Sequence, residues 1–296
     1  MLGNSKRTFT HLLTAMGLAV VSLPQQTRAD DAPASASATS SDKQNYTLFN
    51  VTPASQLRPL SADANDGVMD PTTLDAGHVE IQGSLVDYYT YSKDYNSYEH
   101  FSEDHFVWGP RISIGLTHNV DLFLHPSFQV TSYSYSGQYN ASHDSSGYEG
   151  INIGAKVNLW GNDGGQTAFS VAPYLSFPNH ENSVLGGADI SFAVRLPNQF
   201  YLKFMTDPSA INGKHDSVSF GMENSVSLHR TFYDNLDTYA YLNTTIEPGT
   251  VPWYGYAGFG LGYQFTSNFE LFGGIGFGLT SNSYDYNPRL GLVLRF

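Results

Sequence analysis

Charged side chains in the apolar stretches of this chain mostly occur at alternate positions, which share one face in an extended strand. Ten residues with this spacing are candidates for lining a polar interior: Arg111, Asp121, His125, Lys156, Asp189, Arg195, Lys203, Glu223, Glu270 and Arg289. Because both signs of charge are present, these side chains either form ion pairs that hold the fold closed or line a narrow polar path for solutes. The sequence leaves both interpretations open.

The histidines do not stand in a pattern typical of an enzyme or a metal site. His100, Glu103, Asp104 and His105 are close together, but their segment is predicted to be an outer loop, where solvated side chains are the simpler interpretation. We find no closed set of four metal ligands and no Ser–His pair on one lipid-facing row, as outer-membrane phospholipases use. We therefore expect no enzymatic activity, no catalytic residues, no metal and no cofactor.

Strands must position these side chains, because apolar residues recur with a period of two from residue 78 onward. Twelve such runs are found, and the clearest lie near the C-terminus. Short turns, such as 117–119 and 266–268, alternate with longer polar segments, such as 92–103 and 134–147. This alternation and an even strand count are typical of an antiparallel transmembrane β-barrel of the bacterial outer membrane.

Six glycines distinguish the barrel from a soluble β-sandwich, which would show the same alternation. They lie opposite the apolar face of two neighbouring strands: Gly258, Gly260, Gly262, Gly274, Gly276 and Gly278. In a sandwich they would face water and weaken the strands. In a barrel they would thin one inner wall, leaving room for a ligand, an inserted loop or the segment 46–77.

A few residues do not fit the alternation. Pro110 would remove a hydrogen-bond donor from within a strand, and Asp87 and Asn224 fall on the apolar face. A β-bulge shifts the register of a strand by one residue. We expect such a bulge near residues 86–89.

The chain divides into three regions. Residues 1–29 are predicted to be a signal peptide, because Lys6 and Arg7 precede a mostly apolar run that ends near small residues. Residues 30–77 are predicted to be a flexible linker followed by a lead-in that contacts either the lumen or the periplasmic rim, with a poorly ordered tail as the alternative. Residues 78–296 are predicted to form the barrel.

Composition excludes several classes of protein. The net charge of −13 argues against a nucleic-acid partner. Because the chain has no cysteine, it is not a disulfide scaffold. No apolar run reaches the roughly 18 residues that a transmembrane helix needs.

The C-terminus is typical of a protein inserted into the outer membrane. Four alternating apolar residues end the chain and resemble the signal read by the barrel assembly machinery: Leu290, Leu292, Leu294 and Phe296. Aromatic residues gather near strand ends, as expected for rings at the lipid headgroups. The expected partners are therefore outer-membrane lipid, the assembly machinery and an unidentified small-molecule solute.

Several stretches resemble a family of outer-membrane barrels, the "transporter" family named for the meta-pathway of phenol degradation. The resemblance lies in residues 57–63 with 74–80, 112–122, 154–165 and 287–292. It implies a barrel with a transport role and brings no catalytic residues with it. The chain departs from the family pattern at residues 63–66, where Asp-Ala-Asn-Asp replaces a run similar to Asp-Arg-Pro-Asp.

Twelve strands lie between the filled eight-stranded barrels and the open 16-stranded porins, so a wide pore is not expected. The favoured function is passive uptake of small molecules through the outer membrane, with aromatic or hydrophobic solutes as candidate cargo. The alternative is a structural or ligand- and partner-binding barrel with a plugged lumen and no transport.

Overall fold

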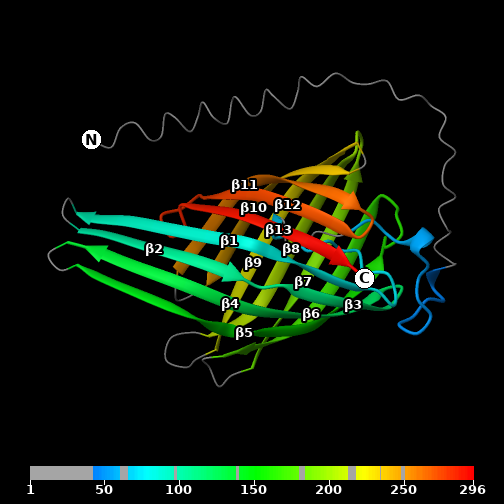
Figure 1. The fold of residues 1–296 in the computed structure, drawn as a ribbon, viewed down its shortest axis with the longest axis horizontal. Helices are drawn as coiled ribbons and strands as arrows, with labels where there is room; N and C mark the ends of the chain where they lie inside the picture. The colour runs from blue at the N-terminus through cyan, green and yellow to red at the C-terminus, as the bar shows by residue number, and fades with distance from the viewer. Residues whose placement is uncertain are drawn as a thin grey trace. The chain divides into compact units, whose positions relative to one another are not determined.

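The computed structural model describes residues 43–60, 66–96, 99–137, 140–179, 184–212, 218–233, 235–247 and 251–296. The predicted signal peptide and residues 30–42 lie outside this range. The described residues form a closed antiparallel β-barrel, as the sequence predicted (Figure 1). They contain no helix long and apolar enough to cross a membrane.

In the described residues, thirteen β-strands follow a 3₁₀ turn at Ala54–Gln56 and form one sheet. They are β1 (Val79–Asn96), β2 (Glu99–Trp108), β3 (Arg111–Thr117), β4 (Val120–Ser136), β5 (Ala141–Trp160), β6 (Thr167–Pro178), β7 (Leu185–Leu196), β8 (Phe200–Asn212), β9 (Val218–Phe232), β10 (Leu236–Glu247), β11 (Val251–Thr266), β12 (Phe269–Gly278) and β13 (Tyr286–Arg295). The sheet closes because β13 pairs with β1. Since β2 and β3 both pair with β1 and β4, they form one interrupted strand of a twelve-stranded barrel.

Two irregularities account for residues that did not fit the alternation. The break between β2 and β3 falls at Gly109 and Pro110, where proline cannot donate to the ladder. The expected bulge lies between Ser84 and Val86, just before the predicted position. It turns Asp87 into the lumen, where the carboxylate accepts a hydrogen bond from Asn287 Nδ2 at 2.7 Å.

The two ends of the barrel differ. Both the C-terminus and short turns such as 118–119 lie at one end, here called the turn end, and the other end is called the loop end. At the loop end, β1, β2, β4 and β5 extend past their neighbours (Figure 1). We call this extension the lip, and it comprises residues 91–96, 99–105, 129–137 and 140–147.

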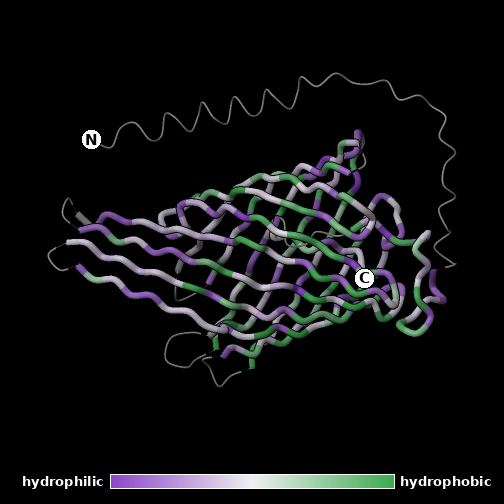
Figure 2. The backbone as a smooth tube through the Cα atoms, viewed as in Figure 1, coloured by the Kyte–Doolittle hydropathy of each residue, from purple (hydrophilic) through white to green (hydrophobic). Residues whose placement is uncertain are grey.

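The lip corrects one expectation. Residues 92–103 and 134–147 were predicted to be polar loops, but most of them pair as strands, for example Asp94 with His100 and Ser134 with Ser142. Figure 2 shows that the lip is mostly hydrophilic, whereas apolar residues gather in the barrel wall. Alternating Ser and aromatic residues form paired strands in the lip, although they lack the apolar face that reveals a lipid-facing strand.

The outer face of the wall is apolar. Leu175 is 53% exposed and Leu261 is 51% exposed, and many other large apolar side chains share this outward position. Tyr148 and Trp108 both pack against Phe128 on the outer face, forming part of an aromatic girdle. A closed barrel with such an exterior belongs in a bilayer. The chain is therefore a bacterial outer-membrane β-barrel.

Candidate functional site

A short stretch of the N-terminal lead-in lies inside the barrel. Most side chains of residues 66–76, here called the plug, are buried although no strand or helix contains them. One end of the plug contacts β8, β9 and β10, and the other contacts β4 and β13. Because these strands lie on opposite sides of the ring, the plug crosses the lumen.

Asp66 anchors the first end of the plug. Its carboxylate lies 2.9 Å from Lys203 Nζ and 2.6 Å from His229 Nε2. The other ring nitrogen of His229 lies 2.5 Å from the carboxylate of Asp237, and Tyr239 stacks on the same ring. Burial raises the pKa of Asp66, but Lys203 and His229 outweigh it and hold that pKa well below its ordinary value.

The middle of the plug combines apolar packing with hydrogen bonds. Met69 forms a small buried core with Phe123 and Ala172. Lys156 Nζ donates to the carbonyl of Asp70 at 3.2 Å, and Asn158 Nδ2 donates to the carbonyl of Pro71 at 2.8 Å. Side chains of the barrel wall thus provide hydrogen bonds to backbone carbonyls of the plug, which does not pair with any described strand.

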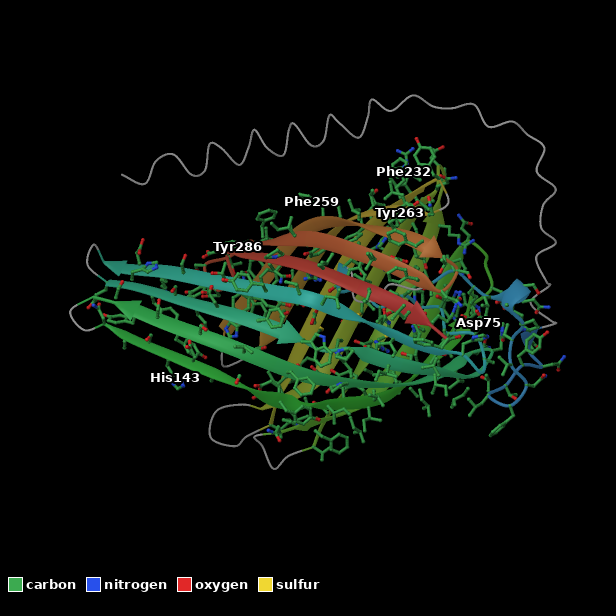
Figure 3. All side chains as sticks on the ribbon, in the orientation of Figure 1. Asp75, His143, Phe232, Phe259, Tyr263 and Tyr286 are labelled. Atoms are coloured by element: carbon green, nitrogen blue, oxygen red, sulfur yellow. The ribbon has the colours of Figure 1, made fainter. Side chains whose placement is uncertain are left out.

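Asp121 and two arginines hold the other end of the plug. The amide of Leu74 donates to the Asp121 carboxylate at 2.8 Å. Asp75 accepts a hydrogen bond from the Arg58 amide at 2.6 Å, and its carboxylate lies 3.8 Å from Arg295 NH1. Figure 3 shows Asp75 at the turn end, far from His143 on the lip. A space of only about 20 Å³ remains beside these groups, enough for one water molecule.

A charged cluster covers the rim at the turn end. Asp163 lies 2.9 Å from Arg58 Nε, 3.2 Å from Lys43 Nζ and 2.8 Å from His118 Nε2. Burial raises the pKa of Asp163, but Arg58, His118 and Lys43 outweigh it and lower that pKa overall. Burial lowers the pKa of His118, and Arg58 and Lys43 add to this effect.

The loop-end half of the lumen contains a cavity of about 300 Å³. It is lined by Tyr89, His105, Val107, Gln129, Glu223, Asn243, Thr245, Tyr254, Tyr256, Tyr284, Asn287 and Arg289. Asn243 also reaches the plug, since its Nδ2 lies 3.5 Å from the carbonyl of Asp66. The plug therefore lies at the floor of this cavity.

Tyrosine rings use the room left by the inner-wall glycines. A Cβ atom on Gly258 would lie 2.4 Å from the Tyr241 ring, and one on Gly260 would lie 2.2 Å from the Tyr239 hydroxyl. Cβ atoms on Gly274 and Gly276 would meet the same two hydroxyls. The glycines thus accommodate side chains of β10 at these positions.

The predicted lumen residues have different surroundings. Asp121, Lys156 and Lys203 contact the plug directly. Arg111 lies over the Phe123 ring at 3.8 Å and reaches the sulfur of Met69.

The other predicted lumen residues do not contact the plug in the same way. Glu223 and Arg289 line the cavity, and His125 lies 3.0 Å from the carbonyl of Gly109. Glu270 is buried on β12, Asp189 is half-buried on β7, and Arg195 is exposed near the turn end.

Sequence reasoning missed several charged residues of the turn end. Asp66 and Asp75 belong to the plug itself, Arg58, His229 and Arg295 contact it, and Asp163 pairs with Arg58. His229 had a usable signal, because it shares the inward face of β9 with Ser225 and Ser227. Asp66 and Asp75 had no such sequence signal, because the irregular segment that contains them has no periodicity.

Within the part of the chain that the structure describes, no group of three or more His, Asp or Glu side chains is arranged to hold a metal ion. The Asp66–His229–Asp237 chain has the order of a relay, and the Ser227 hydroxyl lies 3.1 Å from the same His229 Nε2, but Lys203 and His229 both bind the Asp66 carboxylate and Ser227 is buried beside them. Its geometry is that of an anchor.

No protein-family model matches the sequence, and a search of curated proteins finds no match. Among solved structures, the chain is similar to an outer-membrane channel from Pseudomonas putida F1, at 15% identity and a TM-score of 0.51, covering 83% of this chain and 100% of that chain. It is also similar to the transport unit of the autotransporter AIDA-I from Escherichia coli, at 9% identity and a TM-score of 0.51, covering 73% of this chain and 89% of that chain. These similarities support the barrel fold.

Proposed function

We propose that this chain is an outer-membrane channel for passive passage of small solutes, in which the plug restricts the path. The observation that carries the proposal is the division of the lumen into a polar cavity at the loop end and a plug at the turn end. Short strand-free segments that are held by side chains, and not by a ladder, can move without unfolding the wall. Motion of the plug would connect the cavity to the periplasm.

The lining of the cavity suggests the cargo. Its tyrosine rings offer faces for stacking on a ring-shaped solute, which agrees with the aromatic cargo suggested from the sequence. Glu223, Asn243 and Arg289 also border the cavity, so a purely hydrophobic solute would separate these polar side chains from water without offering a hydrogen bond in return. We therefore propose small solutes that combine a ring face with polar groups.

Two further assignments belong to this proposal. The resemblance in residues 57–296 supports membership of the phenol meta-pathway family. The outward-facing Leu290, Leu292 and Leu294, followed by Phe296, support recognition by the barrel assembly machinery.

The plug also favours a second function, a binding barrel without transport. Its contacts with β4, β5, β8 and β9 are numerous, and several are buried ion pairs. Removing one partner from a buried pair is costly. If the plug never leaves, the cavity binds a ligand from outside and releases it to the same side.

Conductance in planar bilayers separates the two functions. We expect the full chain to show small, fluctuating conductance and a variant lacking residues 43–77 to show conductance several-fold larger and steady. Heat-dependent mobility in gels would establish that the variant barrel is folded. A full chain with neither conductance nor solute flux in liposomes would overturn the channel proposal and leave the binding barrel.

A further inference from the structure

Aromatic rings form a continuous row from the cavity wall to the lip. Consecutive ring centroids lie 5.3 to 6.5 Å apart along the whole row. The members, in spatial order, are Tyr254, Tyr256, Tyr284, His105, Tyr133, Phe101 and Tyr91. We call this row the aromatic track.

The track lies on the inner face of the lip. His105 is buried and lines the cavity, and Tyr133 and Phe101 follow it on the same face. The opposite face carries small polar side chains, such as Ser102 and Ser134, whose hydroxyls lie 2.7 Å apart. The lip thus continues the inward-facing tyrosines of the cavity wall. Rings on an inner face serve something other than lipid contact.

Hydrogen-bonding groups accompany the rings. Glu103 lies 2.6 Å from His105 Nε2 beside the middle of the track. At the cavity floor, Asn243 Oδ1 is buried and has no hydrogen-bond partner among the described residues. Arg289 is held by the side-chain oxygen of Asn287 at 2.6 Å, beside the same cavity. The track therefore has hydrogen-bonding groups beside its middle and at its cavity end.

We propose that the aromatic track binds a neutral oligosaccharide and guides it from the lip into the cavity. A sugar ring has faces of C–H bonds that pack on aromatic rings, and its hydroxyls both donate and accept hydrogen bonds. Because a row of seven rings repeats one kind of surface, it suits a ligand whose own rings repeat. This inference rests on the proposed function, since it names the solute of that channel.

Charge and the number of rings in the track argue against other ligands. A chain with a net charge of −13 repels anionic solutes. A single aromatic molecule would cover only one or two of the seven rings of the track. An organic cation would match the carboxylates and the rings but not Arg289.

Titration calorimetry on the full chain in detergent tests the ligand class, with maltohexaose, cellohexaose, phenol and choline as probes. We expect one of the hexaoses to bind, and Tyr133→Ala and Phe101→Ala each to weaken that binding about tenfold or more. The matched control is Ser136→Ala on the outer face of the lip, which should bind as the unchanged chain does. Heat-dependent gel mobility establishes that each variant is folded.

The outcomes are distinct. Binding of phenol or choline without binding of either hexaose would overturn the proposal. Hexaose affinity that stays the same in both aromatic variants would overturn it too. Calorimetry does not depend on conductance, so the two proposals fail separately. Hexaose binding without conductance would support the aromatic track and contradict the channel. Conductance without hexaose binding would support the channel and contradict the aromatic track.

Discussion

The turn-end and loop-end halves of the lumen are lined by the same strands but arrange their polar side chains differently. At the turn end, Asp66, Asp163 and Asp121 each contact a donor or a cation within 3 Å, and the plug fills the space between them. At the loop end, tyrosines dominate, and a cavity of about 300 Å³ remains. Charges at the turn end fix a segment in place, whereas those at the loop end border open space.

This difference indicates that one inward-facing charge is not equivalent to another. Lys203 and Glu223 have the same predicted role, and both face the lumen. Lys203 is paired with a fully buried carboxylate, whereas Glu223 faces the cavity. Substitutions should therefore affect stability in the first half and solute passage in the second.

The largest expected effect follows from Lys203→Ala. Asp66 would keep His229 but lose its closest permanent cation, at a cost of about 3–5 kcal/mol for a buried pair that loses one partner. We expect faster proteolysis within residues 43–77 and a lower unfolding temperature. Lys93→Ala, at an exposed position on the lip, is the control and should change neither. Equal protease resistance in both variants would mean that Asp66 is not the anchor.

Gly260→Ala should destabilise the boundary between the two halves. The new Cβ would lie 2.2 Å from the Tyr239 hydroxyl and 2.4 Å from the carbonyl of Gly273, and Tyr239 stacks on the anchoring His229. We expect a loss of about 1–3 kcal/mol in unfolding free energy, as for other overpacked sites. In Gly273→Ala the nearest atom is 3.5 Å away, so this variant should unfold like the unchanged chain. If the two glycine variants have the same unfolding free energy, the Tyr239 ring does not depend on the space beside Gly260.

Acidification should weaken the turn end specifically. The pKa values of Asp66 and Asp163 are lowered from 3.8, so their contribution to stability is present above that pH and is lost as the pH falls through the lower values of the folded chain. The pKa of His118 is lowered from 6.5, so a smaller loss begins below pH 6.5. Unfolding temperatures measured from pH 8 to pH 3 should therefore fall slowly below 6.5 and steeply below 3.8.

The comparison for this pH series is Asp163→Asn, which should show a smaller fall below pH 3.8 than the unchanged chain. Asp94→Asn on the lip should follow the unchanged chain. A steep fall that survives the Asp163 substitution unaltered would assign the acid sensitivity to other carboxylates.

The smallest effect on stability is expected for Glu223→Gln. The hydrogen bond from Ser225 to its carboxylate is long, at 3.4 Å, so its loss should cost about 1 kcal/mol or less. The preference for cations over anions, measured from the reversal potential in a salt gradient, should decrease because the cavity loses a negative charge. A large drop in unfolding temperature with unchanged selectivity would contradict the contrast between the two halves.

Much of the wall could be predicted from the sequence. The alternation that ends in Leu290, Leu292 and Leu294 identifies lipid-facing positions, and the misfit of Asp87 located a bulge to within a few residues. The lip was not predicted, because alternating Ser and Tyr residues have no apolar face to detect. Its strands are held by pairing with one another, such as His105 with Thr131 on the next strand.

The site was predicted only in part. The inward direction of Lys203 and Arg289 followed from strand alternation, but the Asp66–Lys203 contact did not, because one partner belongs to a segment without periodicity. The aromatic track was missed for a related reason. Its rings come from β1, β2, β4 and β11 and from the segment before β13, and their neighbours are set by strand register and not by chain order.

The sequence by itself determined which residues face lipid and which face the lumen, because a strand alternates its side chains locally and lipid accepts only one kind of face. The tertiary structure decided how the lumen is filled. Closure of the sheet brings strands that are distant in the chain to opposite sides of one narrow space, and only there do Asp66, Asp75 and the track rings find their partners.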